Sequence, residues 1–140
     1  MKSHGLLLPL FALIFALVLL SPGTVPAQSN KSYSAKLTSP QPGQVVYPGQ
    51  VVRIAWTSKF PAVDLSYCEA EIFLSLDGGK TIYSRLTESR NPAQQYFDWT
   101  VPNTPTNQAV LDIRFGCLNL YPETPSVQLK STFTIAPITK

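Results

Sequence analysis

The sequence of 140 residues has very little of the side-chain chemistry that enzymes and metal sites depend on. Its single histidine is His4, and its only two cysteines are Cys68 and Cys117. Histidine is the most common metal ligand and a frequent general base, and a structural zinc site takes four ligands. We therefore expect no metal, no cofactor and no enzymatic activity in this chain.

The sequence also lacks a strong charge of either sign. It carries 11 Lys and Arg residues against 8 Asp and Glu residues, which gives a formal net charge of +3. The basic residues are scattered along the chain, whereas nucleic-acid-binding domains gather them on one face or in one stretch. We therefore expect no nucleic-acid partner.

The one long apolar run lies near the N-terminus, over residues 6–20. Lys2 precedes this run, and Val25-Pro26-Ala27 follows it with residues that suit the −3 and −1 positions of a cleavage site. A membrane-spanning helix needs about 20 apolar residues, so we favour a cleaved export signal over an uncleaved membrane anchor. The expected signal covers residues 1–27, and a flexible segment follows at residues 28–33. This predicts a secreted, periplasmic or cell-surface protein without membrane contact after cleavage.

The clearest pattern in the remaining chain begins at Cys68. Alternate residues from 70 to 76 are apolar, with the period of two that is typical of a strand with one buried face. Asp77-Gly78-Gly79 follows, and these residues accept the positive φ angles of short hairpin loops. We therefore expect two strands joined by a tight turn over residues 68–86.

Similar alternation predicts an all-β fold for the whole segment 34–137. Trp56 and Trp99 lie in phase with the apolar residues of their strands, so we expect both in the core. The prolines after residue 27 fall outside the strand interiors, as they must because proline cannot donate to a sheet ladder. The pattern favours a seven-stranded antiparallel β-sandwich. Besides the hairpin, strands are expected at residues 34–38, 50–57, 95–101, 109–117 and 129–135, with a brief edge pairing at 45–46.

Four stretches between residues 37 and 135 carry a family resemblance: SPQPGQVVYPGQVVRIAWTS, IFLSLDGGKTIYSRL, YFDWTVPNTP and STFTI. Together they resemble an immunoglobulin-like or fibronectin-III-like module. Modules of this type occur in Ser/Thr-rich GPI-anchored fungal cell-wall proteins and in many secreted bacterial proteins. The resemblance implies a sandwich fold and an extracytoplasmic setting, and it implies no particular activity.

Two cysteines in an exported chain predict one disulfide, between Cys68 and Cys117. Both lie on the inward parity of strands that we expect to be antiparallel neighbours. If they face each other, residues whose numbers sum to 185 stand opposite one another. The predicted pairs are Ile72 with Ile113, Leu74 with Leu111, and Glu71 with Arg114 on the outer face.

Several patterns have both a chemical and a structural interpretation, and we favour the structural one. Ser75-x-Asp77-x-Gly79-x-Thr81 resembles the Asp-box of β-propellers, but one copy cannot build a propeller and serves to set a turn. Glu69 and Glu71 lie about 6–7 Å apart along a strand, a spacing that fits glycoside hydrolysis, but an open sheet face offers them no cleft. No loop spacing gathers a calcium ligand set from the candidate oxygen donors Asp64, Asp77, Asp98 and Asp112.

Three loops are expected to meet at one pole of the sandwich, at residues 58–67, 88–93 and 118–127. Two of them are longer than a hairpin requires, and they carry aromatic residues. The candidate contact residues are Phe60, Tyr67, Arg90 and Tyr121. The alternative is that these aromatic residues only cap the open end of the core.

The favoured function is a secreted, non-catalytic binding or adhesion module that recognises an extracytoplasmic polysaccharide or protein. The alternative is a structural or assembly subunit of a cell-envelope or extracellular complex. A hydrolase is the least favoured class, because neither Gly-x-Ser-x-Gly nor Ser-x-x-Lys occurs in the sequence.

Overall fold

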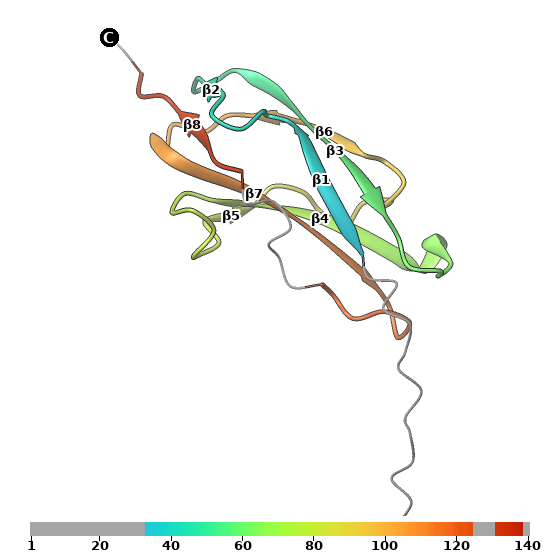
Figure 1. Ribbon diagram of the computed structural model, residues 1–140. Coiled ribbons are helices and arrows are strands. Elements are labelled where there is room, and N and C mark those ends of the chain that lie inside the picture. Colours follow the sequence, from blue (N-terminus) through green and yellow to red (C-terminus); the bar gives the residue numbers. More distant parts are fainter. Residues whose placement is uncertain (1–32, 125–130, 139–140) are drawn as a thin grey trace, which may run out of the picture. The chain divides into compact units, whose positions relative to one another are not determined.

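The computed structural model describes residues 33–124 and 131–138, and this part of the chain is built from strands (Figure 1). Its only helical element is a 3₁₀ turn, η1 (Leu65–Tyr67), and no described helix is long and apolar enough to cross a membrane. The predicted signal and residues 28–32 lie outside the described residues. The strands are β1 (Ser34–Ser39), β2 (Val45–Val46), β3 (Val51–Lys59), β4 (Cys68–Ser75), β5 (Ser84–Arg85), β6 (Tyr96–Thr100), β7 (Thr106–Cys117) and β8 (Phe133–Ile135).

The strands form two sheets, with the orders β1-β3-β6 and β2-β8-β7-β4-β5. All neighbours are antiparallel except β2 and β8, which are parallel. The described residues form eight strands, and β2 and β8 are parallel. The prediction of seven antiparallel strands is therefore wrong on both points. The reason is that two residues carry too little pattern to specify the direction of β2. Its place is set by the open sheet edge, where Ala136 N–H donates to Val46 O at 2.9 Å and Thr134 N–H donates to Gln44 O at 2.9 Å.

The two sheets pack through one apolar core. The inward residues Val52, Ile54 and Trp56 of β3 belong to the same buried cluster as residues of β4 and β7 in the other sheet. Trp56 and Trp99 are both buried in this cluster, as predicted. Trp99 meets Phe133 of β8 edge to face, with ring centroids 6.2 Å apart. This shared apolar cluster therefore holds the two sheets together.

The predicted register between β4 and β7 is confirmed at every position tested. Cys68 stands opposite Cys117, and the following pairs are Glu71 with Arg114, Ile72 with Ile113, and Leu74 with Leu111. A slip by one residue would turn one apolar set away from the core, so burial and the cysteine pair select the same register.

The predicted hairpin has a wider connection than a tight turn. Strand β4 ends at Ser75 and β5 spans only Ser84–Arg85, so residues 76–83 form a loop. One carboxylate holds this loop: Asp77 accepts hydrogen bonds from Thr81 N–H at 3.0 Å, Thr81 Oγ1 at 2.7 Å and Lys80 N–H at 3.0 Å. Gly78 and Gly79 adopt the positive φ angles that were expected. The Asp-box pattern is thus a loop-setting device in this fold.

Candidate functional site

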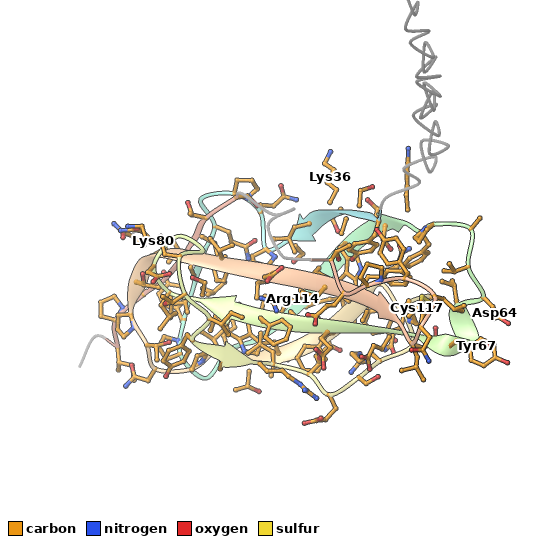
Figure 2. The ribbon with its side chains drawn as sticks, turned by 90° about the horizontal axis from the view of Figure 1, so that it is seen from below. Lys36, Asp64, Tyr67, Lys80, Arg114 and Cys117 are labelled. Atoms are coloured by element: carbon orange, nitrogen blue, oxygen red, sulfur yellow. A yellow bond between two sulfur atoms is a disulfide. The ribbon has the colours of Figure 1, made fainter. Side chains whose placement is uncertain are left out.

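The disulfide between Cys68 and Cys117 is formed, as predicted, and it joins the first residue of β4 to the last residue of β7. The loop before β4 therefore ends at the disulfide, and the loop after β7 begins there. Figure 2 shows Cys117, Tyr67 and Asp64 at one end of the molecule, with Lys80 at the other end. The candidate site lies at the disulfide end.

The loop after β7 is closed by its own backbone. Cys117 N–H donates to Tyr121 O at 2.9 Å, and the N–H groups of Leu120 and Tyr121 both donate to Cys117 O at 3.1 Å. Asn119 at the tip has a φ of 58°, in the left-handed region that asparagine tolerates better than most residues. This turn holds the side chains of Leu118 and Leu120 in solvent, with exposed fractions of 77% and 56%.

The loop before β4 is organised by Asp64. Its carboxylate accepts from Ser66 N–H at 2.9 Å and from Ser66 Oγ at 2.8 Å, and these hydrogen bonds lower the pKa of Asp64 from its ordinary value. The capped turn η1 follows and presents Tyr67, whose side chain is 64% exposed. Tyr67 O in turn accepts from Leu118 N–H at 3.2 Å, which ties the two loops together.

Between these loops lies an open hollow of about 760 Å³. Its lining is formed by residues 66–69, Ser89 and residues 116–123, and we call it the pole hollow. Among residues 33–124 and 131–138, the charged residues of the lining are Glu69 and Glu123, without any Lys or Arg. Gly116 lets one wall approach closely, because a Cβ added there would lie 3.4 Å from the Cα of Glu123.

Two of the four predicted contact residues lie in the lining of the pole hollow, namely Tyr67 and Tyr121. Tyr67 is exposed, whereas Tyr121 is partly buried and packs on Phe115 with ring centroids 5.6 Å apart. The hydroxyl oxygen of Tyr121 also accepts from Tyr33 N–H at 3.0 Å. Tyr121 is therefore both a wall of the hollow and a part of the end of the core.

The other two predicted contact residues lie elsewhere. Phe60 packs against both Tyr33 and Phe115, with ring centroids 5.9 Å and 5.1 Å away, in a second apolar cluster. The backbone of Arg90 forms an isolated antiparallel bridge with the backbone of Ala70. The guanidinium of Arg90 lies 5.1 Å from the ring centroid of Phe97. Neither side chain lines the pole hollow. For Phe60, the core-capping alternative describes its packing.

Tyr33 departs from the expected flexible segment at residues 28–33. It is buried, and its ring stacks on Phe115 with centroids 5.0 Å apart. Burial, with a smaller contribution from the carboxylate of Asp112, raises the pKa of the Tyr33 hydroxyl above its ordinary value. The sequence placed Tyr33 outside the domain because a single aromatic residue before the first strand has no periodic neighbours that would indicate burial.

Sequence reasoning missed Leu118 and Leu120 as site residues. Their only signal is two leucines that flank an asparagine immediately after the inward-facing Cys117. An apolar pair of this kind also fits a strand end, and only the closed turn of residues 117–121 shows that both side chains point into solvent.

Charged side chains of β4, β5 and β7 in the larger sheet form ion pairs. Glu71 pairs with Arg85 at 3.0 Å, and Arg114 pairs with Asp112 at 2.9 Å and with Glu123 at 3.2 Å. Within residues 33–124 and 131–138, no three His, Cys, Asp or Glu side chains are placed to share a metal ion. The lining of the pole hollow offers a partner apolar side chains, two carboxylates and the polar groups of Ser66, Ser89 and Asn119.

Comparison with known proteins finds no matching family model, no matching curated protein and no matching solved structure.

Proposed function

We propose that this chain is an extracytoplasmic, non-catalytic binding module whose partner docks at the pole hollow. The observation that carries the proposal is the exposure of Leu118, Leu120 and Tyr67 around one concave surface. Exposed apolar side chains that occur singly are ordinary on protein surfaces, but a group of them around a concave surface is typical of an interaction site. Large side chains of this kind contribute much of the binding free energy when a partner removes them from water.

The loops that present these side chains are held in place before any partner arrives. Backbone hydrogen bonds close the turn at residues 117–121, a further one joins it to Tyr67, and the disulfide fixes the bases of both loops. Binding by such loops costs less conformational entropy than binding by loops that must first become ordered. This rigidity favours a role of the two loops in recognising a partner over a role in which they only connect strands.

The strand order supports an immunoglobulin-like interpretation of the fold. One sheet contains β1, β3 and β6, and β7 lies at the centre of the other, between β8 and β4. Immunoglobulin-like sandwiches divide their strands between two sheets in a comparable way and use the loops at one end for recognition. A disulfide also suits an oxidising compartment outside the cytoplasm, where an export signal would deliver the chain.

The proposal is tested by screening the oxidised protein, residues 28–140, on a glycan array and on an array of extracellular protein domains. A double variant, Leu118→Ser with Leu120→Ser, removes the exposed apolar groups of the pole hollow. The matched control is Val45→Ser with Ile138→Ser, which removes two exposed apolar side chains outside the lining.

We expect the wild-type protein to bind at least one class of probe, the double variant to lose that signal, and the control to keep it. Failure of the wild-type protein to bind any probe, or a signal that survives in the Leu118→Ser, Leu120→Ser variant, would overturn the proposal. Thermal melting of each variant shows whether a lost signal reflects lost folding.

A further inference from the structure

Among the residues that the structure describes, the lining of the pole hollow combines apolar side chains with charges of one sign. Its exposed apolar side chains are Tyr67, Leu118 and Leu120, and its charged lining residues are Glu69 and Glu123. Glu123 shares a 3.2 Å ion pair with Arg114, whereas Glu69 forms no ion pair within the described part of the chain. A ligand that enters the hollow therefore meets an apolar surface beside carboxylates.

We infer that the partner is a protein segment that inserts an apolar side chain into the pole hollow and places Lys or Arg beside Glu69 and Glu123. This inference rests on the proposed function and names the partner of the same site. An apolar anchor gains free energy by leaving water against Leu118 and Leu120. A neighbouring cation complements the carboxylates, which sets specificity and accelerates encounter.

The lining disfavours a polysaccharide as the occupant. Leu118 and Leu120 have no hydrogen-bonding groups, whereas buried sugar hydroxyl groups need hydrogen-bond partners to offset the loss of water. Hydroxyl groups placed against these two leucines would therefore lack a partner, although Ser66, Ser89 and Asn119 elsewhere in the lining carry hydrogen-bonding groups. An apolar amino-acid side chain has no such requirement.

The charges also disfavour two other occupants. A second copy docked through the same pole would bring Glu69 and Glu123 of both copies together, and like charges across an interface are unfavourable. An anionic membrane surface would meet the same repulsion, because basic rather than acidic groups bind such surfaces. A partner with basic residues removes this conflict.

The size of the hollow fits a short segment. Its volume of about 760 Å³ is large enough to hold a few side chains of a protein segment. Its walls include the two loops joined by the hydrogen bond between Leu118 and Tyr67.

The test uses two matched peptide libraries and the oxidised protein, residues 28–140. Each peptide has a central Leu or Phe, flanked by Lys and Arg in one library and by Asp and Glu in the other. Fluorescence anisotropy measures binding at low and at physiological salt. We expect selection from the basic library only, with affinity that falls as salt screens the exposed charges.

Charge-reversal variants locate the effect. Glu69→Lys reverses a lining charge, and Asp98→Lys on β6 makes the same change in net charge outside the lining. We expect Glu69→Lys to weaken binding of the basic peptides about fivefold, which is the upper end for one exposed charge pair, and Asp98→Lys to leave it unchanged. Equal loss in both variants would overturn the inference, because it would reflect net charge alone.

The outcomes separate this inference from the proposed function. Equal selection from both libraries, or Leu118-dependent binding only to a glycan or to phosphatidylcholine vesicles, would overturn the basic-segment inference and leave a binding site at the pole hollow. Absence of binding to peptides, vesicles and both arrays would overturn the inference and the proposed function together.

Discussion

The backbone N–H of Leu118 donates a 3.2 Å hydrogen bond to the carbonyl oxygen of Tyr67, beside the point where Cys68 and Cys117 are joined. This contact connects the loop that precedes β4 to the turn that follows β7. Both loops carry exposed apolar side chains, so the contact also fixes those side chains relative to one another. The disulfide and this hydrogen bond together define the shape of the pole hollow.

Removal of the disulfide in a Cys68→Ala, Cys117→Ala variant is expected to lower the free energy of unfolding by about 4 kcal/mol. The crosslink joins residues that are 49 positions apart. On the loop-entropy model, closing a loop of this length in the unfolded chain stabilises the fold by about 4 kcal/mol. Chemical denaturation of the oxidised wild-type protein and the variant measures the difference. An unchanged unfolding midpoint in the variant would contradict the expectation.

Phe60 and Tyr67 lie in one loop but are expected to respond differently to alanine. Phe60 packs against two aromatic rings, so Phe60→Ala should cost about 2 kcal/mol of stability, below the value for a fully buried phenylalanine. Tyr67 is exposed, so Tyr67→Ala should change stability by no more than about 0.5 kcal/mol.

The same pair of variants separates packing from recognition. Once a partner is identified, Tyr67→Ala should weaken binding and Phe60→Ala should leave affinity unchanged below its lowered melting temperature. The reverse pattern, with Phe60→Ala weakening binding and Tyr67→Ala lowering stability, would show that these roles are assigned wrongly.

Tyr121→Phe tests the link between the end of the core and the wall of the hollow. The substitution keeps the ring against Phe115 but removes the hydroxyl oxygen that accepts from Tyr33 N–H at 3.0 Å. A part-buried N–H without a partner costs about 1–2 kcal/mol, and urea denaturation measures this loss. Wild-type stability in Tyr121→Phe would show that solvent replaces the hydroxyl without cost.

Asp77 makes the stability of the 76–83 loop depend on pH. Hydrogen bonds from the Thr81 side chain and backbone, and then from Ser75, hold the pKa of its carboxyl well below the ordinary value. The unfolded chain, with an ordinary aspartate pKa of about 3.9, therefore takes up the proton more readily than the folded chain. The contribution of Asp77 is complete above about pH 5 and is lost as pH falls below that value.

We therefore expect the melting temperature of the wild-type protein to fall more steeply between about pH 5 and about pH 2 than that of Asp77→Asn. The control is Glu69→Gln, because the carboxylate of Glu69 accepts no side-chain hydrogen bond among the described residues. Parallel pH profiles for Asp77→Asn and the wild-type protein would show that this carboxylate does not couple protonation to folding.

The core and the central register follow from local pattern in the sequence. Alternation in β4 and β7 marks the inward residues, and the two cysteines select one register among those that keep them inward. Local pattern does not show which charged side chains form ion pairs with each other. Glu71 stands opposite Arg114 but pairs with Arg85, because the 76–83 loop returns β5 beside β4.

The candidate site depends on contacts between residues far apart in the chain, and local pattern does not contain them. Phe60 and Tyr67 both read as loop aromatics, and the distinction comes from Tyr33, which packs on Phe60 from outside the first strand. Leu118 and Leu120 are exposed because the turn at residues 117–121 closes on its own backbone. Only the fold therefore shows which apolar loop residues cap the core and which are exposed to solvent.

The most direct test of the central claim is calorimetric titration of the identified partner into the oxidised wild-type protein and two double variants. For Leu118→Ser with Leu120→Ser, we expect a Kd raised about tenfold or more with an unchanged melting temperature. For Val45→Ser with Ile138→Ser, we expect the wild-type Kd. A wild-type Kd for the Leu118→Ser, Leu120→Ser variant would contradict binding at the pole hollow.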